Sequence, residues 1–194
     1  MPRALPDIPL QPGAVFSTAW LRRWGQNPSR LAHELEARGL VRRLGHGLYH
    51  APRMSRFGEV PPADEALLTA FFGGAPFVIT GPPRWNPLGL GSTALFAHPL
   101  VYNTRRSGVV VLGGRTFLSR RVAFPTDPPP EWFVIDLLRH ADTVGMNRRD
   151  LARALTLRVQ SGRFSPELLS EMARRFGGPA EVTIVREATA PRGA

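Results

Sequence analysis

The stretch "NPSRLAHELEARGLVRRLGHGLYHAP", residues 27–52, carries the strongest indication of fold in this chain. Asn27 is a preferred residue immediately before a helix, and Pro28 suits the first helical position because its missing N–H has no partner there. Leu31 and Leu35 follow one helical turn apart, so they share the side that a helix buries. The first half of the stretch therefore predicts a short amphipathic helix.

The second half of the stretch predicts a basic β-hairpin. Gly39 ends the helical pattern, and two segments of alternating residues come after it at 40–44 and 48–51. The glycine-histidine-glycine sequence between them is typical of a tight turn. A short helix is thus expected to lead into a two-stranded ribbon that carries arginine and histidine.

A second short helix is expected just before this stretch, in "VFSTAWLRRWG". Ser17 is a natural N-terminal cap, and Phe16 and Leu21 have the spacing of a hydrophobic staple. Gly25 is expected to end this helix. Helix, turn, helix and hairpin in this order predict a winged helix.

A winged helix suggests contact with DNA, because its second helix fits the roughly 12 Å wide major groove and its ribbon can run along the backbone. The helix start also favours a phosphate through the helix dipole. Winged helices serve as protein-docking modules as well, and Glu34 and Glu36 would repel DNA if they pointed at it, so this alternative stays open. The predicted DNA-binding residues are Asn27, Ser29, Arg30, His33, Arg42, Arg43 and His46.

Composition agrees with a globular protein that meets phosphate. Of 194 residues 43% are hydrophobic, and 25 basic residues, all of them arginine, face 15 acidic ones, which gives a net charge of +10. A solvated surface in a GC-rich genome is the competing explanation for this charge. No stretch is apolar over the length of a membrane span, and there is no cysteine, so we expect a cytoplasmic protein without disulfides or thiolate metal sites.

Prolines and glycines divide the chain into the segments of an α+β protein. Within the second half we expect a helix at 64–72, a strand at 77–80, a hairpin over 108–124, helices at 131–144, 147–160 and 165–178, and then a short strand. The predicted organisation is an extended arm at 1–13, a winged helix-turn-helix at 14–52, a linker at 53–62, a mixed α+β domain with C-terminal helices at 63–186, and a disordered tail at 187–194.

The second domain offers two pairs of arginines near strand ends. Arg105 with Arg106, and Arg120 with Arg121, are possible additional phosphate contacts, although solvated strand edges protected by charge explain them equally well. Trp85, with the leucines after it at 88 and 90, is expected in the core. The glycines of that segment lack the strand–loop–helix pattern of a nucleotide site, so no cofactor is predicted.

A metal-dependent nuclease is the least favoured alternative. Such an enzyme needs clustered acidic residues, and the acids of the second half are instead expected to cap helices or solvate their faces. The five histidines are dispersed along the sequence, and no serine lies in a nucleophile elbow. We therefore expect neither an enzyme nor a metal site. The acids considered are Asp64, Glu65, Glu131, Asp136, Asp142 and Asp150.

Two blocks of the sequence resemble a known family. The pattern "FSTAWLRRWG…NPSRLAHELEARGLVRRLGHGLYHAPR" is similar to the N-terminal winged helix of the AbiEi-type antitoxins of type IV toxin–antitoxin systems, and "VITGPPRWNPLGLGSTALFAHPLVYNTRRSG" and "GGRTFLSRRV" resemble the second domain of that family. The resemblance covers residues 14–124. It implies a repressor that binds inverted repeats in double-stranded DNA of its own promoter. We expect the protein to be a monomer or homodimer. It also implies opposition to a nucleotidyltransferase-like toxin without a stable complex.

Overall fold

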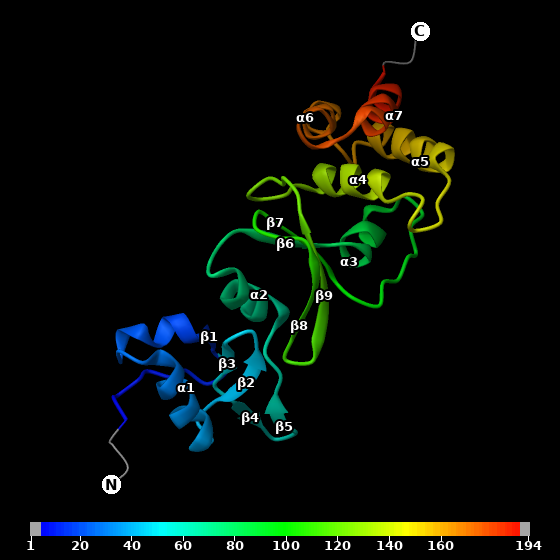
Figure 1. Cartoon of the computed structure of the whole chain (residues 1–194). Helices are drawn as coiled ribbons and strands as arrows, with labels where there is room; N and C mark the ends of the chain where they lie inside the picture. The colour runs from blue at the N-terminus through cyan, green and yellow to red at the C-terminus, as the bar shows by residue number, and fades with distance from the viewer. Residues whose placement is uncertain (1–4, 191–194) are drawn as a thin grey trace. The chain divides into compact units, whose positions relative to one another are not determined.

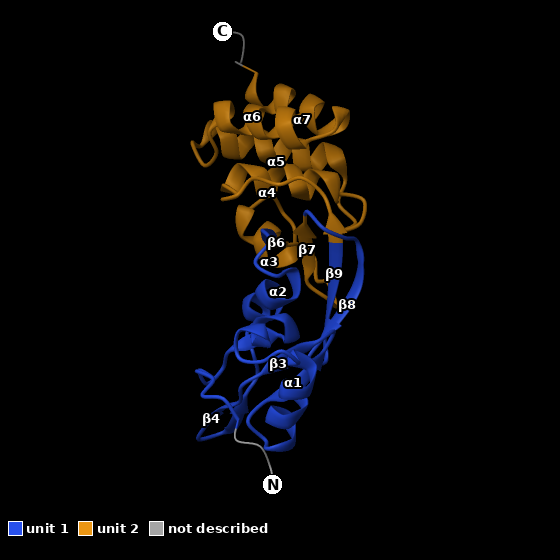
Figure 2. Ribbon diagram, turned by 60° about the vertical axis from the view of Figure 1, so that its left-hand side comes forward, with its two compact units in different colours: residues 1–77, 104–119 blue, residues 78–103, 120–194 orange. Residues whose placement is uncertain are grey.

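The computed structural model describes residues 5–190 and has the predicted α+β fold, in two compact units (Figure 2). Unit 1 extends to residue 77 and includes 104–119, whereas unit 2 comprises 78–103 and the chain from 120 onwards. The expected division into domains at 14–52 and 63–186 differs from this, because helix 64–72 and most of the later hairpin fold with the N-terminal region. None of the helices within residues 5–190 is long and apolar enough to span a membrane.

Unit 1 contains the predicted helix–turn–helix. Strand β1 (Val15–Ser17) leads into a 3₁₀ helix, η1 (Thr18–Arg23), in which the Ser17 hydroxyl accepts the Trp20 N–H at 3.3 Å. Helix α1 (Pro28–Ala37) starts where expected, and Asn27 Oδ1 accepts the Arg30 N–H at 3.0 Å. Leu31 and Leu35 are buried, as predicted, in one core with Leu21, Val41 and Tyr49.

The predicted wing is also present, and it is part of a three-stranded sheet. Strands β2 (Arg42–Gly45) and β3 (Leu48–His50) form the hairpin, and β1 pairs antiparallel with the other edge of β3 (Figure 1). The Gly47 carbonyl accepts hydrogen bonds from the N–H and hydroxyl of Thr18, at 2.7 and 3.0 Å. At the turn, His46 has a φ of +50° between two glycines that also have positive φ. The wing tip is therefore fixed to the start of η1.

The segments on either side of the winged helix are more ordered than expected. Leu5, Ile8 and Leu10 of the arm pack against the core around Phe16, because the arm supplies apolar side chains at the core's edge. The segment 53–62, expected as a linker, folds back into an antiparallel hairpin of β4 (Arg53–Ser55) and β5 (Gly58–Val60). Its turn is stabilised by the Ser55 hydroxyl, which accepts the Phe57 N–H and donates to the Gly58 carbonyl.

Helix α2 (Asp64–Phe72) and the hairpin of β8 (Gly108–Leu112) and β9 (Arg115–Arg121) complete unit 1. Asp64 pairs with Arg115 at 2.7 Å, and the Gly113 N–H donates to the Leu44 carbonyl of the wing at 2.9 Å. These long-range contacts explain why both elements fold with the N-terminal region rather than with the C-terminal helices. The last two residues of β9 belong to unit 2.

Unit 2 contains neighbouring strands and a helical stack. Strand β6 (Phe77–Thr80), of which all but Phe77 lies in this unit, is adjacent to β7 (Leu100–Asn103). Between them lie the short helices α3 (Pro82–Trp85) and η2 (Asn86–Leu88). Trp85, Leu88 and Leu90 are buried, which confirms that they are core residues. The stack consists of α4 (Pro130–Arg139), α5 (Arg148–Gln160), α6 (Pro166–Phe176) and α7 (Pro179–Thr189) (Figure 1).

The prediction of a short strand after residue 178 is wrong, because residues 179–189 form helix α7. The β-branched residues of this segment favour a strand locally, but Pro179 occupies the first helical position and Glu181 accepts the Gly178 N–H at 2.7 Å. Val185 and Ala188 are buried. The predicted tail at 187–194 is therefore helical as far as Thr189, and its residues 191–194 lie outside the described part of the chain.

Candidate nucleic-acid interface

The polar face of α1 is exposed in the way that the sequence predicts. Ser29, Arg30 and His33 point away from the core that buries Leu31 and Leu35, and the Arg30 side chain is 60% exposed. This orientation arises from the helical period, because Ser29 and His33 are two positions from Leu31, on the opposite side of the helix, and Arg30 lies between their positions and the buried stripe. Three of the predicted contact residues are thus available to a ligand of unit 1.

Acidic side chains of α1 lie beside its basic face. Arg30 lies 3.4 Å from the Glu34 carboxylate, and His33 Nδ1 lies 3.7 Å from that of Glu36, a pair that is ionic only when His33 is protonated. Exposed pairs of this kind contribute at most about 1 kcal/mol each, so a phosphate can displace them at small cost. Glu34 and Glu36 nevertheless reduce the positive potential that a duplex would meet at α1.

The start of α1 is a weaker phosphate site than the sequence suggests. Pro28 has no N–H, and the N–H of Arg30 is already used by Asn27, which leaves Ser29 as the first-turn donor. An open cavity of about 660 Å³ lies here, bordered by Trp24, Arg30 and the acidic Glu34. Asn27 is therefore a capping residue first, and only its amide N–H₂ remains for a ligand.

The wing carries a basic residue that lacks an acidic partner. Arg42 is held by Glu59 of β5 at 2.8 Å, whereas Arg43 is exposed and forms no ion pair within residues 5–190. His46, at the tip, is exposed and sets its ring edge-on to that of Phe71, with centroids 5.6 Å apart. Of the predicted residues, Arg43 is the most available to a phosphate, because it is exposed and no acid of the described residues pairs with it.

Two further arginines of the same unit were not among the predicted site residues. Arg22 and Arg23 are exposed in the last turn of η1, directly before the turn into α1. In helix-turn-helix proteins the first helix crosses the DNA backbone, so basic residues at this place suit phosphates. The Arg-Arg pair in the sequence "WLRRWG" could have indicated these two residues as phosphate contacts.

The arginine pairs of the second half occupy the strand ends that the sequence predicts. Arg105 and Arg106 lie between β7 and β8, and the Arg106 guanidinium sits 4.4 Å from the centroid of the Phe71 ring. Arg120 and Arg121 end β9 and belong to unit 2. All four are exposed, and Arg106 already has an aromatic partner.

His50 is a buried histidine at the end of the wing strand β3. Its side chain is 2% exposed, and its Nε2 has no hydrogen-bond partner in the described part of the chain. Burial, reinforced by the nearby Arg42, lowers the pKa of His50 although Glu59 opposes the shift. Just below pH 6.5, the folded protein therefore keeps His50 neutral, whereas the unfolded chain would bind a proton there.

This histidine makes stability depend on pH. Because the folded pKa lies below the unfolded value of 6.5, its contribution is complete above pH 6.5 and is lost as the pH falls below it. We expect the urea midpoint to fall between pH 7.5 and 5.5, and to fall less in His50→Leu. His98→Ala, at an exposed position, should keep the wild-type pH dependence. An equal pH dependence in His50→Leu would contradict the assignment.

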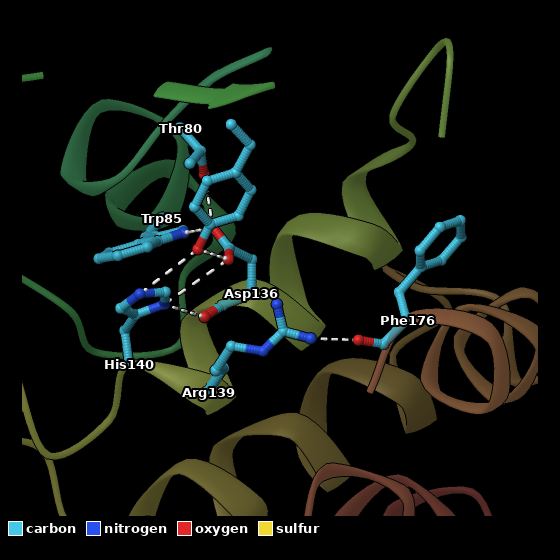
Figure 3. A network of polar contacts seen from close by, with 7 residues as sticks. Thr80, Trp85, Asp136, Arg139, His140 and Phe176 are labelled. Atoms are coloured by element: carbon cyan, nitrogen blue, oxygen red, sulfur yellow. Dashed lines mark hydrogen bonds and ion pairs between the residues drawn. The ribbon is translucent and has the colours of Figure 1, made fainter. Parts of the chain in front are cut away.

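Unit 2 contains a polar network that the sequence did not reveal (Figure 3). Asp136, 2% exposed on α4, accepts hydrogen bonds from the Thr80 hydroxyl at 2.6 Å, the Tyr102 hydroxyl at 2.7 Å and the Trp85 indole N–H at 3.0 Å. His140 stacks on Trp85, and its Nδ1 donates to the Asp136 carbonyl at 2.9 Å. The expectation that Asp136 solvates a helix face is wrong, because α4 is buried along most of its length.

The network joins α4 to three other elements of unit 2. Its donors come from β6, α3 and β7, so one carboxylate joins three elements to the helix. Burial and the Asp136 charge raise the pKa of the Tyr102 phenol, which favours the protonated form that donates to Asp136. Nearby, Arg139 donates to the Phe176 carbonyl (Figure 3).

Glu131 departs from its expected role in the same way. It is 7% exposed and accepts the Ser165 N–H at 3.0 Å, which connects the start of α4 to the start of α6. No three His, Asp or Glu side chains of residues 5–190 are arranged to hold a metal ion.

No family model matches the chain, and a search of curated proteins finds no match.

Proposed function

We propose that this protein is a sequence-specific DNA-binding transcriptional regulator that represses its own promoter. The observation that carries the proposal is the exposed basic surface of the winged helix. Arg22, Arg23 and Arg43 form no ion pair with the acids of residues 5–190, and Arg30 and Arg42 are held only by surface ion pairs. Counterion release from phosphates would supply affinity, and side chains of α1 would read base edges.

The resemblance to AbiEi-type antitoxins supports a more specific role. In this proposal the chain is a cytoplasmic antitoxin, monomer or homodimer, that opposes a nucleotidyltransferase-like toxin without forming a stable complex and that carries out no catalysis. Co-expression with the product of a neighbouring nucleotidyltransferase-like gene tests this part. Growth should be restored while affinity capture recovers no toxin, and continued growth arrest would contradict the antitoxin role.

Protein docking is the second candidate, and a specific observation favours it. An apolar cavity of about 470 Å³ in unit 1 is bordered by Leu10, Phe16 and Trp20 and by the glycines after α2. An apolar cavity of this kind can receive an apolar side chain of a protein partner, and the acids of α1 make its polar face less suited to DNA. This alternative predicts no retention of any duplex at low salt.

Titration of the upstream DNA fragment in increasing salt tests the proposed function. About five phosphate contacts from the arginines of the winged helix should give a slope of log K against log [salt] of about −4 to −5. Fluorescence anisotropy with a labelled fragment measures this slope. The upstream fragment should bind at least about 10³-fold more tightly than a scrambled duplex of equal length. Equal affinity for both duplexes would remove sequence specificity from the proposal.

A further inference from the structure

The hairpin β4–β5 presents two large apolar side chains to water. Phe57 is 85% exposed and Met54 is 70% exposed, although unit 1 has a core that buries most of its other large apolar residues. Neither side chain contributes to that core. Two large exposed apolar side chains within one short hairpin are a candidate contact for a partner.

The turn holds Phe57 in a defined position. The Ser55 hydroxyl accepts the Phe57 N–H at 3.2 Å and donates to the Gly58 carbonyl at 2.9 Å. Gly58 has a φ of +108°, which a residue with a side chain rarely adopts. These contacts fix the backbone at Phe57, so less backbone ordering is needed when its side chain meets a partner.

The charge around the tip indicates a polyanion. Arg53 and Arg56 are exposed, the Arg56 guanidinium lies 4.6 Å from the centroid of the Phe57 ring, and residues 53–58 contain no acid. The next residue, Glu59, is neutralised by Arg42 at 2.8 Å. That ion pair also ties β5 to the wing strand β2, so the hairpin and the wing are connected within unit 1.

An apolar wedge flanked by arginines suits the minor groove of DNA. Such wedges enter between base pairs, unstack them and kink the duplex by about 20–90°. We propose that the β4–β5 hairpin is a second DNA-contacting element, in which Phe57 inserts at a base step of the minor groove while Arg53 and Arg56 contact the flanking phosphates. This inference rests on the proposed DNA-binding function and adds to it a bent duplex.

The test measures bending and binding separately, with the whole chain and a duplex from the upstream fragment labelled at both ends for energy transfer. The wild type should bring the ends closer, and Phe57→Ala should leave the bound duplex straight and weaken binding on the order of tenfold. Phe57→Trp should keep the bend, because an indole ring can also insert between base pairs. Val109→Ala, a similarly exposed apolar position of the same unit at 68%, should behave as wild type. Unchanged urea midpoints would show that all variants fold.

The outcomes separate this inference from the function on which it rests. Wild-type binding to a straight duplex, or bending that survives in Phe57→Ala, overturns the wedge while DNA binding stands. Absence of any retained duplex overturns both. Binding to vesicles of phosphatidylserine and phosphatidylcholine that depends on Phe57, with no bending of DNA, would assign the tip to a membrane surface and also overturn the wedge.

Discussion

The triple variant Arg30→Ala/Arg42→Ala/Arg43→Ala is expected to lose on the order of 10³-fold in affinity for the upstream fragment, because each charge-assisted contact is worth roughly 1.5 kcal/mol or more. The salt slope should fall by nearly one unit for each phosphate contact removed, or about 2–3 units in all. Anisotropy titrations at several salt concentrations measure both quantities. Arg43 is expected to account for the largest share, since no acid competes for it within residues 5–190.

A matched triple variant of unit 2 controls for the loss of charge. Arg153→Ala/Arg174→Ala/Arg175→Ala also removes three exposed arginines and should change affinity less than about twofold at moderate salt, since surface charges that do not contact a phosphate are screened. Thermal unfolding of both variants should shift little, because surface ion pairs contribute at most about 1 kcal/mol. Equal losses of affinity in the two variants would show that binding depends on net charge and not on the winged helix.

Replacement of Asp136 by alanine is expected to cause the largest loss of stability, about 3–5 kcal/mol. The change leaves the buried donors of Thr80, Trp85 and Tyr102 without their acceptor and opens a small cavity under α4. Urea unfolding followed by circular dichroism measures the loss. Asp136→Asn should cost less, because its amide oxygen still accepts hydrogen bonds.

Asp127→Ala provides the control in the same unit, since Asp127 is exposed and its change should alter stability by less than about 0.5 kcal/mol. The DNA affinity of correctly folded Asp136→Asn should stay close to that of the wild type, because the network lies in unit 2 and away from the arginines of the winged helix along the chain. A midpoint for Asp136→Ala equal to that of Asp127→Ala would contradict a structural role for the network.

Local signals account for most of the secondary structure that the sequence predicted. Asn27 and Pro28 start α1 where expected, the glycines around His46 turn the wing, and α2 and β6 have the predicted bounds. These features depend on backbone preferences and on hydrogen bonds between residues a few positions apart, and such short-range signals can be read from one sequence. The winged helix and the exposure of its arginines could therefore be inferred from residue order alone.

Three other features depend on tertiary structure, either on contacts between segments far apart in the sequence or on the burial of a segment against its neighbours. Asp136 is buried among three donors, Glu59 neutralises Arg42, and residues 179–189 form a helix rather than a strand. No local pattern displays the first two outcomes, because they depend on which remote elements pack together. For the third, Pro179 and Glu181 offered a local helix-start signal that the β-branched residues of the segment outweighed in the prediction. Such packing can override a local preference or turn an apparently solvated carboxylate into a buried acceptor.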